Sequence, residues 1–356
     1  MNRLESKLEK IGRDPKITAK AVGLRYGANY EKGFYRVKKN KGFVYWDENQ
    51  NIVRQKEVLN RINNLVIPPA WENVWISPFE NGHLQVTGTD NKGRKQYKYH
   101  PNWNKIRNQS KFHKMQNFAA ALPLIRKKTE KDLNKKGLPY EKVVALVITL
   151  IEMTNIRIGN DAYKKLYGSF GLTTLQDKHV KFDKNHVIFE FFGKKGIKHK
   201  IRLTSKKMVN LVRKCKEIPG QDLFQYYDEQ GNRHVIGSSD INSYLKEVTG
   251  EDFTAKDFRV WTGSVYALTL FLEADKPENQ SQSNKKIIEV LDNVASKLGN
   301  TRTVCKKYYV HPNVIAAYEK GSIWNYKPGR NTGRLYPEEK AFVQLLKKET
   351  IAEASA

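Results

Sequence analysis

The stretch EKVVALVITLIEMTNIRIGN, residues 141–160, decides the fold of the larger part of this chain. It is apolar over about four helical turns, which predicts a buried helix. A helix from 141 to 157 would carry Arg157 at its end, anchored on a rigid element. Its guanidinium could there donate paired hydrogen bonds to phosphate oxygens. The alternative is a helix-terminal arginine that meets only carbonyl groups or solvent.

The charge of the chain indicates a polyanionic partner. Its 356 residues include 64 lysines and arginines against 37 acidic residues, a net charge of +27. Such an excess repels itself unless an anion is bound. Aromatic residues make up 11% of the chain, including 18 tyrosines, which is typical of a folded protein. Basic residues interleaved with aromatic ones favour nucleic acid over a membrane surface.

The lack of a recognisable targeting signal and the small number of cysteines suggest an intracellular protein. No run of about 18 apolar residues predicts a membrane span, and the start, MNRLESKLEKIGRD, lacks the apolar core of a signal peptide. The two cysteines, Cys215 and Cys305, cannot form a zinc ribbon and need not pair. We therefore expect a cytoplasmic location, associated with the nucleoid if the source is bacterial.

The composition changes near residue 105, which predicts two domains, 1–105 and 106–356. Aromatic and β-branched stretches separated by turn sequences make the first domain β-rich. Its predicted strands are GFYRVKK and GFVYWDE, which form a hairpin turning at 40–42, and NVWIS, HLQVTGTD and KQYKYH, with turns at 80–82 and 90–93. Residues 54–64 predict a short helix.

The second domain is expected to be mainly helical. Its one predicted hairpin is HVIFEFFGKKGIKHKIRL, which turns at 193–196, next to a strand at HVKFD. Thr254 and Asp257 have the spacing of a capping box, and Gly299 suits the end of a helix. The predicted helices lie at 104–136, 205–217, 238–248, from Thr254 to about 272, and over IIEVLDNVASKL, which follows a polar loop at 276–284.

No metal-binding or nucleotide-binding motif is found. The chain has no DxD, HExxH, CxxC or Walker A sequence, so nothing suggests Mg²⁺-binding carboxylates or an ATP site. If the protein cuts a phosphodiester, it must use side-chain cations and a covalent nucleophile.

The candidate nucleophiles lie in NTRTVCKKYYVHP, residues 300–312, where Tyr308 and Tyr309 stand among basic residues. A tyrosine with a pKa near ~10 is a poor nucleophile. Nearby cations can activate it because they stabilise the phenolate and the charged transition state. The alternative is a surface turn whose aromatic rings pack on a core.

Two further cations have comparable alternatives. Lys194, in the predicted turn FFGKKG, could protonate a departing 5′-oxygen or could simply be a solvated turn residue. Arg259, in TAKDFRVW, could present a guanidinium from a helix whose Phe258 and Trp261 face inward. It could instead form a structural ion pair with an acid such as Asp257 or Glu273.

Six stretches together resemble the type IB DNA topoisomerases of the short, poxvirus-type and bacterial kind. In family order over residues 65–313, they are IPPAWENVWIS, GTDNKGRKQYKYHP, IRIGNDAYKKLYGSFGLTTLQDKHV, FFGKKGIKHK, AKDFRVWTGS and KLGNTRTVCKKYYVHP. The resemblance implies an α+β fold, in which a small β-rich domain and a larger, mainly helical catalytic domain form a C-shaped DNA clamp. It also implies a monomer that relaxes supercoiled duplex DNA through a 3′-phosphotyrosyl intermediate, contacts mainly the DNA backbone, and needs no ATP, metal or other cofactor.

The resemblance also assigns residues. It makes Tyr309, not Tyr308, the nucleophile, and Lys194 the general acid. The residues implied to stabilise the transition state are Arg157, Arg259 and Asn300, and those implied to contact DNA are Tyr97, Tyr99, Tyr163, Lys164 and Lys165. Asn300 departs from most relatives, which have histidine there. Histidine can donate a charged hydrogen bond to a non-bridging oxygen, whereas an amide donates only a neutral one. The departure bears on the size of this residue's contribution and not on the reaction, since the resemblance includes similar bacterial enzymes with asparagine here.

Two other functions fit some of these features. A tyrosine recombinase or integrase uses the same arginines and tyrosine, but usually carries a helical core-binding domain. The β-rich N-terminal domain with its RKQYKY sequence favours the topoisomerase. A non-enzymatic basic DNA-binding protein would use the same cations only as phosphate contacts.

Overall fold

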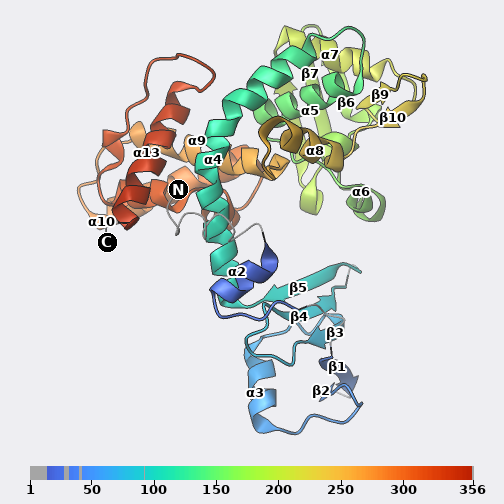
Figure 1. The fold of residues 1–356 in the computed structure, drawn as a ribbon, viewed down its shortest axis with the longest axis vertical. Helices are drawn as coiled ribbons and strands as arrows, with labels where there is room; N and C mark the ends of the chain where they lie inside the picture. Colours follow the sequence, from blue (N-terminus) through green and yellow to red (C-terminus); the bar gives the residue numbers. More distant parts are fainter. Residues whose placement is uncertain (1–13, 28–31, 40–41, 92, 355–356) are drawn as a thin grey trace. The chain divides into compact units, whose positions relative to one another are not determined.

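The computed structural model describes residues 14–27, 32–39, 42–91 and 93–354 (Figure 1). Its contacts divide the chain into two units, 1–113 and 114–356. Helix α4 (Pro101–Leu133) contains both this division and the boundary predicted near residue 105. The first unit is β-rich and the second is mainly helical, so the predicted α+β class is confirmed. No helix in the described ranges is long and apolar enough to span a membrane.

The N-terminal unit is built on a five-stranded antiparallel sheet of order β2-β1-β3-β4-β5. The predicted strands are confirmed as β1 (Phe34–Lys39), β2 (Gly42–Trp46), β3 (Glu72–Ile76), β4 (Leu84–Thr89) and β5 (Lys95–Tyr99). The predicted turns at 40–42 and 90–93 include residues 40, 41 and 92, which lie outside the described residues.

Two helices accompany this sheet. The predicted helix at 54–64 is confirmed as α3 (Lys56–Asn64), which buries Ile62 against strand residues Val74, Ile76 and Val86. The preceding helix, α2 (Pro15–Ala21), begins where the Asp14 carboxylate accepts hydrogen bonds from two backbone N–H groups.

The second unit is centred on α5 (Tyr140–Thr154), the helix predicted from the apolar stretch. Its side chains from 142 to 148 are buried, and it contacts α7 (Lys206–Lys216), α8 (Ser238–Thr249) and α9 (Ala255–Leu272). The predicted end at residue 157 is wrong. Asn155 takes a left-handed conformation with φ 55°, which ends the helix. Arg157 therefore lies in the loop that follows.

The predicted hairpin is confirmed within the three-stranded sheet β6-β7-β8. Strands β6 (Val180–Asp183), β7 (His186–Phe192) and β8 (Lys198–Leu203) are antiparallel, and the short helix η3 (Lys194–Gly196) forms the turn between β7 and β8. A small hairpin of β9 (Gln225–Tyr227) and β10 (Arg233–Val235) was not predicted.

The chain after α9 is also helical. The loop predicted at 276–284 is wrong in its second half, because Asn279 caps the N-terminus of α10 (Gln280–Leu298). The remaining elements are α6 (Asp161–Tyr167), α11 (Arg302–Tyr308), α12 (Pro312–Glu319), α13 (Pro337–Ala354), η1 (Leu172–Thr174), η2 (Asp177–His179) and η4 (Ile323–Asn325). Cys215 and Cys305 are both buried free thiols.

A buried charge cluster fastens α13 to the rest of the second unit. Arg126 of α4 pairs with Glu152 of α5, and its Nη2 lies 2.7 Å from Glu339 Oε1 of α13. Glu339 also accepts a hydrogen bond of 2.8 Å from Trp261 Nε1 of α9. The Phe342 ring packs against the same tryptophan at 5.1 Å. The C-terminal helix thus contacts α9 at Trp261, which is two residues after Arg259.

Replacing Arg126 with methionine should strongly destabilise the protein. The substitution leaves the Glu152 and Glu339 carboxylates in a poorly solvated site without their shared cation, which costs about 3–5 kcal/mol. Urea denaturation would measure the change in the free energy of unfolding. Arg334→Met is the matched control, since Arg334 pairs with Glu130 in an exposed position and its loss should cost at most about 1 kcal/mol. Equal effects of the two changes would contradict the prediction.

Candidate active site

The carbonyl end of α10 brings together the two arginines that the sequence singled out. Arg259 Nη2 donates to the Leu298 carbonyl at 2.7 Å, and Arg157 Nη2 donates to the Gly299 carbonyl at 2.9 Å. Helix C-termini leave such carbonyls unpaired and carry partial negative charge, so they attract cations. Arg259 also donates to the carbonyl of Asn155, the residue that ends α5.

Neither arginine is neutralised by an acid in the part of the chain that the structure describes. The ion pair considered for Arg259 is not formed with Asp257, whose carboxylate accepts instead from the Thr254 backbone and hydroxyl, as the predicted capping box requires. Burial and the charge of Arg157 both lower the pKa of Arg259. Its Nε is buried without a hydrogen-bond partner among the described residues. The site therefore holds two cations and an unused donor, which suits an anionic ligand.

Tyr309 lies beside this cationic pair. It follows the last residue of α11, and the Arg259 guanidinium carbon is 5.0 Å from its ring centroid. Gly263 of α9 permits the close approach of this segment, because a Cβ there would lie 2.7 Å from the Tyr309 carbonyl oxygen. Ser264 Oγ accepts a hydrogen bond of 2.9 Å from the His311 N–H. Helix α9 thus positions both Arg259 and the backbone around Tyr309.

The surroundings of Tyr309 favour its ionised form. Burial alone would raise the pKa of the phenol, but the nearby positive charges of Arg259, Arg157 and Lys256 oppose it. The net effect lowers the pKa below the ordinary value of tyrosine. Lys256 was missed in the sequence. Its place three residues before Arg259 on the same helix face is the signal that could have found it.

The other candidate site residues differ in their surroundings. Asn300 Oδ1 accepts a hydrogen bond of 2.5 Å from Arg157 Nη2, and its amide nitrogen donates to the Leu298 carbonyl at 3.3 Å. Tyr308 has Lys307 near its ring, with the Nζ 5.5 Å from the centroid. Lys194 is exposed on the turn η3, the position predicted for it.

The candidate DNA-contacting residues lie on two elements, one in each unit. Tyr97 and Tyr99 are two residues apart on β5 and so lie on the same face of the strand. Their rings are nearly parallel, with the centroids 6.1 Å apart. Tyr163 and Lys165 are exposed on α6. Lys164, on the same helix, forms an ion pair of 2.5 Å with Asp222. A phosphate would have to compete with this carboxylate for Lys164.

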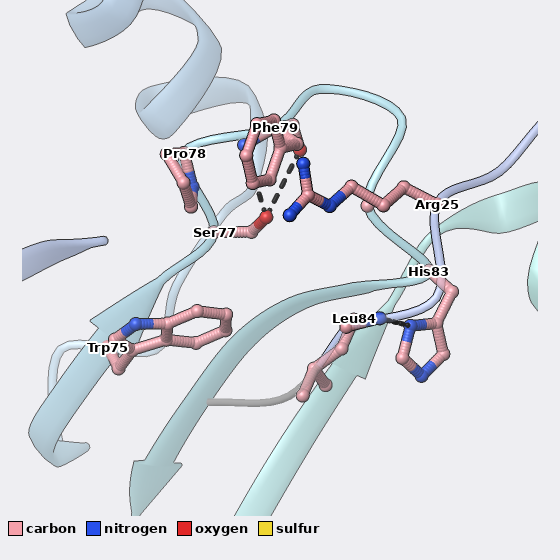
Figure 2. Close-up of a pocket in the computed structure, with 9 residues that line it drawn as sticks. Arg25, Trp75, Ser77, Pro78, Phe79, His83 and Leu84 are labelled. Atoms are coloured by element: carbon pink, nitrogen blue, oxygen red, sulfur yellow. Dashed lines mark hydrogen bonds between the residues drawn. The ribbon is translucent and has the colours of Figure 1, made fainter. Parts of the chain in front are cut away.

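The N-terminal unit has a small cavity lined by the loop that follows β3 (Figure 2). Its volume is about 10 Å³, roughly the space needed for one water molecule. The Arg25 guanidinium lies over the Phe79 ring at 3.8 Å, and Ser77 Oγ exchanges hydrogen bonds with the Phe79 backbone. The hydrogen bonds hold the loop after β3 in its own conformation, and the Arg25–Phe79 contact joins this loop to the chain before β1.

Comparisons with known proteins match the part of the chain that carries this site. A family model described as "Eukaryotic DNA topoisomerase I, catalytic core" matches residues 100–328, more than half of the chain. One described as "Bacterial DNA topoisomerase IB, N-terminal domain" matches residues 42–90. The DNA topoisomerase 1B of Acanthamoeba polyphaga mimivirus is 31% identical over 297 residues, 81% of this chain and 88% of that protein. This chain belongs to the type IB DNA topoisomerases.

More distant relatives of this type IB topoisomerase include the DNA topoisomerase 1B of Vaccinia virus (strain Copenhagen). It is 21% identical over 268 residues, which are 74% of this chain and 80% of that protein. The resemblance drawn from the six sequence stretches is therefore confirmed. The protein is an isomerase whose substrate is duplex DNA.

Removing the Arg259 charge should raise the pKa of Tyr309. Arg259 is the strongest of the groups that favour the phenolate, so in Arg259→Gln the phenol should ionise at a higher pH. NMR titration of protein with ¹³Cζ-labelled tyrosine would follow this, with the Tyr309 signal assigned from Tyr309→Phe. Arg302→Gln is the control, because the exposed Arg302 is paired with Asp292 and should leave the titration unchanged. A Tyr309 midpoint that is the same in wild type and Arg259→Gln would contradict this electrostatic account.

Proposed function

We propose that this topoisomerase relaxes supercoiled DNA through a 3′-phosphotyrosyl intermediate formed on Tyr309. The observation that carries the proposal is the position of the phenol, 5.0 Å from the buried Arg259 and within the field of Arg157. A phenolate is a far better nucleophile than a phenol, and these cations favour it. Tyr308 has the ammonium of Lys307 near its ring, 5.5 Å from the centroid.

In the proposed reaction, Tyr309 Oη attacks a backbone phosphorus. A new P–Oη bond forms, the bond between phosphorus and the 5′-oxygen breaks, and the phenol proton passes to solvent. Negative charge grows on the non-bridging oxygens, where Arg157, Arg259 and Asn300 can donate hydrogen bonds. Donors already in place in a poorly solvated site are the most effective means of stabilising such charge.

Lys194 is proposed as the acid that protonates the departing 5′-oxygen. The energy of the phosphodiester is retained in the tyrosyl linkage, so the free 5′-hydroxyl can attack it after the strand has swivelled. Resealing the nick in this way consumes no ATP and uses side-chain cations in the place of a metal ion. The protein is proposed to act as a monomer. Its net charge of +27 supports binding mainly through DNA phosphates, which would weaken as salt is raised.

Tyr309→Phe should abolish both the covalent adduct and relaxation, because it removes the attacking oxygen. Tyr308→Phe, its neighbour and matched control, should retain both. The measurement is relaxation of supercoiled plasmid at low salt in EDTA without ATP, together with trapping of an SDS-stable protein–DNA adduct. A wild-type protein that leaves the plasmid supercoiled, or an adduct lost in Tyr308→Phe instead, would refute the proposal.

Asn300 provides a separate test of the phosphate-binding donors. Asn300→Ala removes one neutral donor and should slow single-turnover cleavage by at most about 10³-fold. Asn300→Asp keeps the shape and the acceptor for Arg157 but adds a negative charge beside the phosphate, so it should be slower still. Cleavage by the aspartate variant at the wild-type rate would show that this amide contributes no donor.

A further inference from the structure

His199 lies in the stretch FFGKKGIKHK, but neither the sequence analysis nor the proposed reaction gives it a role. It lies on β8, five residues after Lys194, and is paired across the hairpin with Phe191. Its imidazole stacks on the Phe191 ring with the centroids 5.1 Å apart and the planes 20° from parallel. The strand pairing and this stack hold the ring at the mouth of the hairpin turn.

The imidazole also touches two turns that are far apart in the sequence. A Cβ on Gly193, the residue before Lys194, would lie 2.7 Å from the His199 Cδ2 and Nε2 atoms. A Cβ on Gly299, the residue before Asn300, would lie 2.8 Å from its Cε1 atom. The ring therefore makes close contact with both glycines and sets the distance between the two turns.

The His199 ring lies near the positive charges of Arg157 and Arg259 but forms no hydrogen bond with either. Burial, Arg157 and Arg259 lower the pKa of His199, which favours the neutral imidazole. Among the described residues, neither ring nitrogen has a hydrogen-bond or ion-pair partner. A neutral ring without polar contacts acts on its neighbours through its shape, not through its charge.

We propose that His199 is a positioning residue for proton transfer from Lys194, because its ring fixes the Lys194 turn against the turn that carries Asn300. This inference rests on the proposed function. In the step concerned, a Lys194 Nζ–H bond breaks, its proton passes to the 5′-oxygen, and the P–O5′ bond breaks as the P–Oη bond to Tyr309 forms. Without the His199 ring, the Lys194 turn loses this contact with the turn that carries Asn300. The Lys194 ammonium is then misplaced relative to the 5′-oxygen.

The test compares two leaving groups in single-turnover cleavage. One DNA substrate carries the ordinary 5′-oxygen at the cleavage site, and the other carries sulfur at that position. A thiolate departs without a proton because thiols are more acidic than alcohols, with pKa near ~8.5 in cysteine. His199→Ala should cleave the oxygen substrate up to about 100-fold more slowly than wild type, since small misplacements have effects of that size. It should cleave the sulfur substrate at nearly the wild-type rate, as Lys194→Ala should.

A second variant tests the contact itself. Gly193 has φ −93°, which alanine adopts without strain. Among the described residues, the added methyl group of Gly193→Ala would lie closer than 3 Å to the His199 ring alone. Gly193→Ala should lower the cleavage rate of the oxygen substrate and leave that of the sulfur substrate unchanged. The double variant Gly193→Ala/His199→Ala should be no slower than His199→Ala, because the methyl group enters space that the imidazole has left.

His186→Ala is the matched control, a half-buried histidine at the far end of β7, bonded to Arg202. It should cleave both substrates at the wild-type rate, and thermal unfolding would show that each variant is folded. His199→Ala at the wild-type rate, equal slowing with both leaving groups, or additive effects in the double variant would each overturn the inference. Absence of an adduct in wild type would instead refute the proposed function.

Discussion

The two hydrogen bonds from guanidinium groups to the carbonyl end of α10 are the interactions on which the rest of the site depends. Arg259 and Arg157 are held by the adjacent carbonyls of Leu298 and Gly299, which are dipoles without net charge. An acid would hold the arginines more tightly but would neutralise them. Carbonyl groups hold them in place and leave their positive charge available. That charge is what lowers the pKa of Tyr309 against the opposing effect of burial.

Holding two like charges together in a poorly solvated site is unfavourable, so the surrounding helices must keep the arginines in place. Helix α9 carries Arg259 and, through Gly263 and Ser264, also fixes the backbone around Tyr309. On the other side of α9, Trp261 is bonded to Glu339 of the C-terminal helix. Helix α9 therefore connects the cationic pair both to the backbone around Tyr309 and to the C-terminal helix.

Positive charge acts at two distances in this protein. The net charge of +27 is a long-range field that attracts any polyanion and is screened by salt. The arginine pair at α10 acts over a few ångströms on one phenol. A basic residue near the surface can already be paired with an acid, as Lys164 is with Asp222, and a phosphate must then compete with that acid. Chemistry at the phosphodiester is favoured only where cations are left without acidic partners.

The sequence by itself determined the elements whose signals are local. A continuous apolar stretch predicted the buried helix, turn sequences predicted the hairpin with Lys194 at its tip, and the Thr254–Asp257 spacing predicted the start of α9. Motifs in family order predicted the type IB topoisomerase family. The sequence misplaced the end of α5, because the left-handed conformation of Asn155 has no strong signal in an apolar run.

Only the tertiary structure decided which groups meet. It brought Arg157 to a carbonyl 142 residues away, left Arg259 without the acid that its neighbours offered, and placed His199 between two turns. It also revealed Lys256 as a further charge acting on Tyr309. Contacts of this kind depend on the packing of helices that are distant in the chain, and no local pattern of residue types encodes them.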